Sequence, residues 1–210
     1  MSKKRDHKKR VYTVILSFLT VLFLLARAPT NERLTAHAAD QKSKITKQVN
    51  TYMSAIKKYN IPKIKKSLIN KDVFHITDKR LQKYIRKASS DCLRYEITRI
   101  RVKGKTATAY LHVNYYSSKT DFENAMHYVL QDYDKSWSKK KFSKELYSWL
   151  VWAYDPTDES MLNEGTVKIQ LEKRGNKWMI SKMDKKMLFI KDSGLTYFMD
   201  DFAKHHKKYI

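Results

Sequence analysis

The sequence predicts an α+β domain in which helices pack on an antiparallel sheet, with an apolar helix in front of the domain. Apolar residues recur at helical spacing over residues 45–59, alternate with polar residues over 93–115 and 167–180, and return to helical spacing over 120–154 and 195–203. Strands that lie next to each other in the sequence pair as antiparallel hairpins, and the helices between them are then segregated from the sheet. We therefore expect an antiparallel sheet on N-terminal helices, with a helical insertion.

The composition permits one compact domain of this kind. The chain has 210 residues, 42% of them apolar, and its 14 Tyr, 8 Phe and 4 Trp can build a core. Its 4 Gly and 3 Pro are too few for a collagen-like or flexible low-complexity chain. The single cysteine, Cys92, excludes an internal disulfide framework and a zinc site made of several cysteines.

The N-terminus has the pattern of a signal segment. Six basic residues lie among the first ten, and an uncharged apolar stretch follows from Val11 to Ala26. As a helix this stretch would span about 24 Å, less than the hydrocarbon core of about 30 Å, which favours a signal peptide over a transmembrane helix. Because a basic flank stays in the cytoplasm, the rest of the chain is predicted to be extracytoplasmic.

Two fates of this segment stay open. Ala36-His37-Ala38 is a small-residue cleavage site, so cleavage after Ala38 would release a secreted domain that begins near Asp40. The long charged stretch between Ala26 and this site favours the alternative, a membrane anchor retained through Val11 to Ala26. The chain is thus divided into 1–39, a signal peptide or uncleaved signal anchor, and 40–210, a single domain of a cell-envelope protein.

The charge predicts an anionic counterpart. Lys and Arg number 44 against 21 Asp and Glu, a formal net charge of +23. After residue 39 the balance is 36 against 19, so the exported part keeps +17. An extracytoplasmic domain rarely meets nucleic acid, so we expect anionic wall polymer or a lipid surface and no nucleic acid. The alternative is a lysine-rich surface that serves only solvation.

The first three helices follow from apolar spacing and breaking residues. Five apolar residues share one side of a helix that ends near Tyr59: Ile45, Val49, Tyr52, Met53 and Ile56. Pro62 then suits the first turn of a shorter helix. A third helix is expected after Thr77 and Asp78.

The first hairpin is predicted from a period of two. Leu93, Tyr95 and Ile97 alternate with polar residues, and a slip in phase near Thr98 and Arg99 predicts a bulge before the turn at Lys103-Gly104-Lys105. The return strand has an apolar face and a second face with aromatic and amide groups, which would suit a half-wet concavity. The candidate pocket residues are Tyr95, Tyr110, His112, Asn114 and Tyr116.

Two helices are expected between the hairpins. Thr120 and Glu123 have the spacing of a capping box for the first, and the second runs from about Lys139 to Tyr154. Its apolar residues are spread over several sides, so it is either enclosed or presents a surface. As a surface it would pair tryptophans, which prefer a membrane interface, with lysines that meet anionic head groups: Lys139, Lys140, Lys141, Lys144, Trp149 and Trp152.

The second hairpin introduces a family resemblance. Its strands read Thr166-Val167-Lys168-Ile169-Gln170-Leu171-Glu172-Lys173 and Gly175-Asn176-Lys177-Trp178-Met179-Ile180. With the preceding helix pair and first hairpin, this pattern resembles the nuclear transport factor 2-like superfamily, and its ending resembles small exported members from Gram-positive bacteria. The resemblance covers most of residues 41–192 and implies a cone-shaped sheet with a pocket at its wide end. The two-helix insertion departs from the simplest members, and the fold hosts both enzymes and binding modules.

Two functions stay open for such a domain. The first, which we favour, is non-enzymatic binding of a ligand or partner at the cell envelope. The alternative is a small lyase, isomerase or hydrolase with His112 and a tyrosine such as Tyr110 as acid and base. No catalytic residue is assigned, because no spacing identifies a His-Asp pair or a nucleophile. No metal site and no cofactor are expected, since multi-histidine spacings and phosphate-binding glycine loops are absent from the sequence.

Processing can be tested directly. We expect the mature N-terminus at Ala39 or within two residues of it, because the small residues at 36 and 38 fit the signal peptidase. N-terminal sequencing of the exported protein measures this. Recovery of Met1 or Ser2 would replace cleavage with the anchor.

Overall fold

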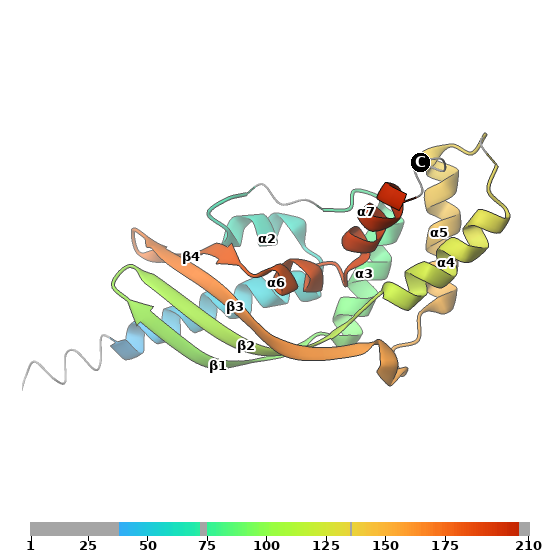
Figure 1. The fold of residues 1–210 in the computed structure, drawn as a ribbon. Coiled ribbons are helices and arrows are strands. Elements are labelled where there is room, and N and C mark those ends of the chain that lie inside the picture. Colours follow the sequence, from blue (N-terminus) through green and yellow to red (C-terminus); the bar gives the residue numbers. More distant parts are fainter. Residues whose placement is uncertain (1–37, 72–74, 135, 206–210) are drawn as a thin grey trace, which may run out of the picture. The chain divides into compact units, whose positions relative to one another are not determined.

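The computed structural model describes residues 38–71, 75–134 and 136–205 (Figure 1). Its contacts divide the chain into two compact units, residues 1–43 and 44–210. Residues 1–37 of the predicted signal segment lie outside the described residues. Among the residues that are described, no helix is long and apolar enough to cross a bilayer. The sheet and the two apolar cores belong to the second unit.

This unit is α+β, as the sequence predicts. A helix described over residues 38–57 precedes eleven further elements, which include the short 3-10 helix η1. They are α2 (Ile61–Ser67), α3 (Lys79–Cys92), β1 (Arg94–Lys103), β2 (Thr106–Tyr116), α4 (Lys119–Gln131), α5 (Lys139–Ala153), η1 (Glu159–Met161), β3 (Leu162–Arg174), β4 (Lys177–Met183), α6 (Lys185–Ile190) and α7 (Leu195–His205).

The four strands form one antiparallel sheet in the order β1-β2-β3-β4. Strands β2 and β3 pair along their length, from Thr106 opposite Glu172 to Tyr116 opposite Leu162. The predicted bulge in β1 is confirmed, because the register shifts between Ile97 and Arg99. Helices α4 and α5 are inserted between the two long central strands and lie side by side beyond the end of β2 (Figure 1).

The first core lies between one face of the sheet and the helix over residues 44–57. The predicted apolar stripe of this helix is confirmed, since its five residues are fully buried: Ile45, Val49, Tyr52, Met53 and Ile56. They pack in one cluster with the alternate residues of the central strands and with Trp178 and Ile180 of β4. Leu68, just after α2, forms a parallel bridge with Ile180, so part of the exposed edge of β4 is covered.

A second core joins the helices α3, α4, α5 and α7. Its fully or nearly fully buried members include Ile85, Val129, Leu146, Leu150 and Leu195. Every residue of both cores lies between positions 45 and 202. The part of the chain after the predicted cleavage site therefore contains the apolar clusters that fold it.

The starts of α3 and α4 show where the local sequence predicts a helix end correctly and where it does not. Helix α3 begins after Asp78, as predicted, and the Asp78 carboxylate caps it by accepting from the backbone N–H groups of Arg80 and Leu81. The predicted capping box at Thr120 is wrong, because α4 begins at Lys119 behind Ser118. The Ser118 N–H donates to the carbonyl of Ser193, 2.9 Å away, so a long-range contact sets this start.

Trp178 tests the sheet assignment. Its side chain is 3% exposed within the first core, so Trp178→Ala should lower the free energy of unfolding by roughly 3–5 kcal/mol, the usual cost of truncating a buried large aromatic. Denaturant unfolding followed by circular dichroism measures it. The matched control is Trp152→Ala, since Trp152 is 68% exposed and should change stability by about 1 kcal/mol or less. Equal effects of the two substitutions would contradict the assignment.

Candidate functional site

The five predicted pocket residues do not share one cavity. Tyr110, His112 and Asn114 point from β2 to the sheet face opposite the first core, where all three are exposed or half-buried. There the His112 ring nitrogen Nε2 is 3.8 Å from a carboxylate oxygen of Glu164. Tyr95 points to the core face instead, and its hydroxyl donates to Asn50 at 3.2 Å.

Tyr116 belongs to a buried polar network at the end of β2. Its hydroxyl and that of Tyr84 donate to the same carboxylate oxygen of Asp121, at 2.8 and 2.6 Å. Burial raises the pKa of Asp121, and the two hydroxyl donors oppose this shift. The network ties α3, β2 and α4 together, so its role is to hold these elements in place.

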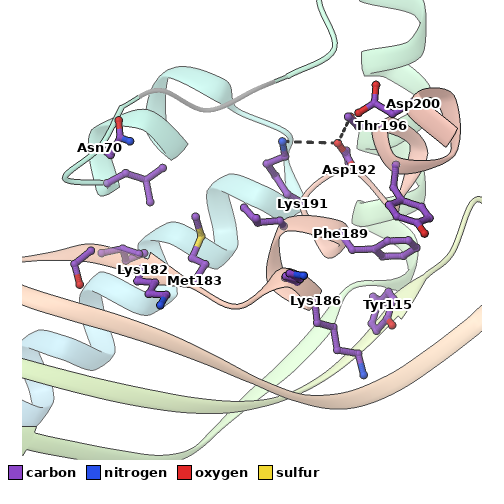
Figure 2. A pocket seen from close by; sticks show the side chains of 16 residues that line it. Asn70, Tyr115, Lys182, Met183, Lys186, Phe189, Lys191, Asp192, Thr196 and Asp200 are labelled. Atoms are coloured by element: carbon purple, nitrogen blue, oxygen red, sulfur yellow. Dashed lines mark hydrogen bonds and ion pairs between the residues drawn. The ribbon is translucent and has the colours of Figure 1, made fainter. Parts of the chain in front are cut away.

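A cavity of about 900 Å³ lies beside β4 and the α6–α7 segment (Figure 2). Its apolar side chains come from the residue just after α2 and from β2, β4, α6 and α7. Its polar side chains come mainly from β4, α6, the chain between α6 and α7, and α7. The lining residues are Leu68, Asn70, Tyr115, Ile180, Ser181, Lys182, Met183, Lys185, Lys186, Leu188, Phe189, Lys191, Asp192, Thr196, Tyr197 and Asp200.

A buried ion pair lines this cavity. The ammonium of Lys191 is 3.7 Å from a carboxylate oxygen of Asp192, and the two side chains are only 6% and 3% exposed. The Thr196 hydroxyl donates to the same Asp192 oxygen (Figure 2). Burial lowers the pKa of Lys191, whereas the neighbouring carboxylate opposes this shift. Because these two ionisable groups are shielded from water, they would interact strongly with any charged group that enters the cavity.

The backbone around this pair is tightly built. Ser193 and Gly194 both have positive φ, +56° and +77°. The Phe189 ring lies where a Cβ of residue 194 would be, 2.1 Å from the nearest ring atom, so glycine is required there. The close approach of Phe189 to Gly194 accompanies the turn between α6 and α7, where Lys191 and Asp192 are buried.

Three further lysines give the cavity its charge. Lys182, Lys185 and Lys186 line it together with Lys191, against two aspartates. The ammonium of Lys186 lies 5.7 Å from the centre of the Tyr115 ring and donates to the carbonyl of Glu164 at 3.2 Å. The cavity thus combines an excess of positive charge with aromatic and aliphatic surface, which fits a ligand that is both anionic and partly apolar.

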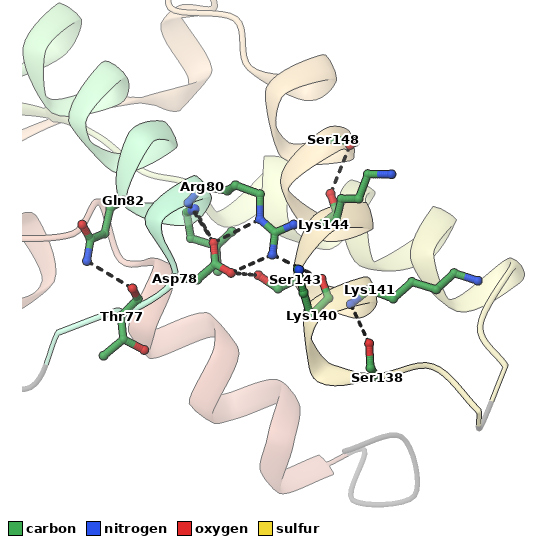
Figure 3. A network of polar contacts seen from close by, with 11 residues as sticks. Thr77, Asp78, Arg80, Gln82, Ser138, Lys140, Lys141, Ser143, Lys144 and Ser148 are labelled. Atoms are coloured by element: carbon green, nitrogen blue, oxygen red, sulfur yellow. Dashed lines mark hydrogen bonds and ion pairs between the residues drawn. The ribbon is translucent and has the colours of Figure 1, made fainter.

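A second cavity, of about 690 Å³, lies between the start of α3 and α5. Asp78 occupies its edge, where one carboxylate oxygen accepts from the Arg80 guanidinium at 2.9 Å and from the Ser143 hydroxyl at 2.6 Å (Figure 3). These donors, the Arg80 guanidinium first, hold the pKa of Asp78 well below its usual range. The polar groups therefore satisfy one another and join α3 to α5.

The lysines and tryptophans predicted to contact an anionic surface lie on α5. Lys140, Lys141 and Lys144 are exposed, and of Lys139 only the backbone is described. Trp152 is exposed, whereas Trp149 is half-buried and stacks on Tyr128 with ring centres 4.3 Å apart. The helix presents a surface, one of the two alternatives that the sequence left open.

The described residues include neither a candidate metal site nor a thiol with a lowered pKa. Within them, no group of three or more His, Cys, Asp or Glu side chains could hold a metal ion. Cys92 is buried with its sulfur 3.9 Å from the Tyr154 hydroxyl, and burial raises the pKa of this thiol. A thiol with a raised pKa is a poor nucleophile at neutral pH.

Comparison with known proteins identifies no relative. No family model, no curated protein and no solved structure matches the chain. A function for this chain is therefore inferred from the geometry of its cavities and surfaces.

The sequence pattern did not predict the buried ion pair or the position of the cavity. Lys191 and Asp192 follow the six-residue helix α6, which the periodicity did not predict. A weak signal existed, because the charged pair stands directly before Ser193 and Gly194 and between two apolar segments. Adjacent charges in a turn are usually solvated, so burial of this pair could not be expected from the sequence.

The Asp78 carboxylate predicts a pH dependence. Because its folded-state pKa lies below the unfolded value of about 3.9, its stabilisation is complete above that pH and is lost as the pH falls toward the folded-state pKa. Asp78→Asn keeps a capping side chain but removes the charge. We expect the free energy of unfolding of this variant to fall less steeply than that of the wild type below pH about 4.

Denaturant unfolding at a series of acidic pH values measures both slopes. Glu96→Gln, which removes a carboxylate from the exposed face of β1, is the control and should retain the wild-type slope. Identical slopes for Asp78→Asn and the wild type would contradict the expectation.

Proposed function

We propose that this chain is an exported, non-enzymatic ligand-binding domain of the cell envelope, and that the cavity beside α6 and α7 is its binding site. Export rests on the basic and apolar N-terminal pattern in the sequence. The helix-covered antiparallel sheet, with a cavity on its core side, supports a cone of the nuclear transport factor 2-like type. The observation that carries the proposal is the grouping of four lysines with apolar surface in one cavity.

The chemistry of the cavity defines the class of ligand. An anionic group, such as a phosphate or carboxylate, would be attracted to Lys182, Lys186 and the buried Lys191. An aliphatic or aromatic body would contact Leu188 and Tyr197, both of which expose apolar surface to solvent in the structure. Each methylene group removed from water adds about 0.8 kcal/mol to such binding.

The alternative, a pocket enzyme with His112 and a tyrosine as acid and base, has less support. His112 and Tyr110 lie on the sheet face opposite the one that contributes Tyr115 to the cavity. Tyr110 is instead flanked by cations, with the Arg101 guanidinium 5.6 Å and the Lys168 ammonium 5.8 Å from its ring centre. A general acid or base must lie within hydrogen-bond reach of a bound substrate.

Binding can be measured by calorimetry with decyl phosphate as the probe. We expect decyl phosphate to bind, and decanol and inorganic phosphate to bind at least about tenfold more weakly, because each offers only half of the complementary chemistry. Lys182→Gln with Lys186→Gln should weaken decyl phosphate binding by about tenfold or more. Tyr197→Ala should weaken it through lost apolar contact.

Two controls make the test specific. Lys103→Gln with Lys105→Gln removes the same charge at the tip of the first hairpin and should leave binding unchanged. His112→Ala should also leave it unchanged. Equal losses in the cavity and hairpin variants, or dependence on His112, would refute the cavity as the site.

A further inference from the structure

Helix α5 exposes one face that the proposed cavity does not explain. Leu146 and Leu150 are fully buried in the second core, which fixes the inner side of the helix. The side chains exposed from this helix include three lysines in its first half and two apolar residues at its end. We call them the α5 face: Lys140, Lys141, Lys144, Val151 and Trp152.

The apolar end of the α5 face is rigidly built. Trp152 is 68% exposed and Val151 47%. Trp149 stacks on Tyr128 at an interplanar angle of 17°, and both rings meet the Trp152 ring edge-on at 5.7 and 5.8 Å. An indole held in place by neighbouring rings loses little conformational freedom on contact with a partner. Exposed indoles of this kind prefer the boundary between lipid head groups and acyl chains.

The three lysines precede the exposed indole of Trp152 on the same helix. At 1.5 Å per residue, Lys144 precedes Trp152 by about 12 Å. Figure 3 shows Lys141 and Lys144 directed away from the contact between Asp78 and Ser143. The Lys141 ammonium rests 4.3 Å from the centre of the Trp137 ring.

Acidic groups flank α5 at both ends. Glu145 is half-buried on α5 itself, Asp132 and Asp134 lie before the helix, and Asp155, Asp158 and Glu159 follow it, at the end that carries Trp152. The carboxylate of Asp134 accepts from the N–H of Ser136. The positive charge of the α5 face therefore lies in its first half, with Lys140, Lys141 and Lys144, and its apolar end is followed by acidic residues.

We infer that the α5 face contacts an anionic lipid bilayer, with Trp152 at the head-group boundary and the lysines over anionic head groups. A wall polymer would match the charge but offers no apolar layer for Trp152. A stable protein interface buries about 800 Å² on each partner, more than two exposed apolar side chains supply. Small apolar area combined with lysines is sufficient for reversible interfacial binding.

The test is sedimentation with vesicles of phosphatidylcholine, alone or mixed with phosphatidylglycerol. The chain from Ala39 onward is used, since the apolar N-terminal segment would itself bind lipid and both cores lie after it. We expect binding to the anionic vesicles only, and weaker binding as salt shortens the Debye length from about 30 Å at 0.01 M to about 8 Å at 0.15 M.

Matched variants separate the α5 face from overall charge. Lys140→Gln, Lys141→Gln and Lys144→Gln together should reduce binding more than tenfold, since each lysine near an anionic surface is worth about fivefold. Lys103→Gln, Lys105→Gln and Lys177→Gln remove the same charge from exposed positions at the two hairpin turns and should have little effect. Equal losses in the two triple variants would overturn the inference.

Tryptophan fluorescence gives a second measurement, which does not respond to electrostatic binding alone. Brominated acyl chains should quench the tryptophan emission of the bound protein, and Trp152→Phe should remove most of this quenching. Lys182→Gln with Lys186→Gln should leave vesicle binding intact, which distinguishes this surface from the cavity. Equal binding to neutral vesicles, tryptophan emission that lipid does not quench, or equally tight binding of soluble teichoic acid would each refute the bilayer contact.

Discussion

The pairing of β2 with β3 is the constraint on which the rest of this molecule depends. An uninterrupted register from Thr106 opposite Glu172 to Tyr116 opposite Leu162 decides which face each side chain of the two strands occupies. The apolar face then receives the helix over residues 44–57, whose five stripe residues are fully buried. A slip of one residue would exchange the two faces and expose this core. The same pairing holds both ends of the α4–α5 insertion, because that insertion leaves β2 and returns to β3.

The segment between α6 and α7 connects the two cores and contributes the buried ion pair to the cavity. Its Ser193 carbonyl accepts from Ser118 at the start of α4, and its Gly194 lies under the Phe189 ring. The cavity is therefore lined by residues of the sheet core, such as Tyr115 and Ile180, and by residues of α7. Burial of Lys191 and Asp192 at this junction has a desolvation cost, which their mutual attraction and the Thr196 hydroxyl offset. A costly pair in a cavity is more understandable as part of a binding site than as a source of stability.

The proposed ligand site and the proposed membrane contact use the net positive charge in different ways. In the cavity, lysines stand close to aromatic and aliphatic walls, so charge and shape would select one molecule. On α5, separated lysines and one exposed indole suit an extended surface, with weak contacts that act together. Different residues build the two surfaces, so either function could be lost by mutation without the other.

The sequence by itself determined most of the helices and strands of this protein, and tertiary contacts decided the start of α4 and where the cavity and its charged residues lie. Helical spacing predicted the apolar side of the helix from Ile45 to Ile56, the phase slip predicted the bulge near Thr98 and Arg99, and the start of α3 after Asp78 was expected. Each of these depends on residues only a few positions apart. Alternation also showed that β2 has two different faces. It could not show which face borders a cavity, and Tyr110, His112 and Asn114 proved to lie on the other one. The start of α4 at Ser118 and the buried pair Lys191 and Asp192 depend on partners far away in the chain, and no local pattern encodes such partners.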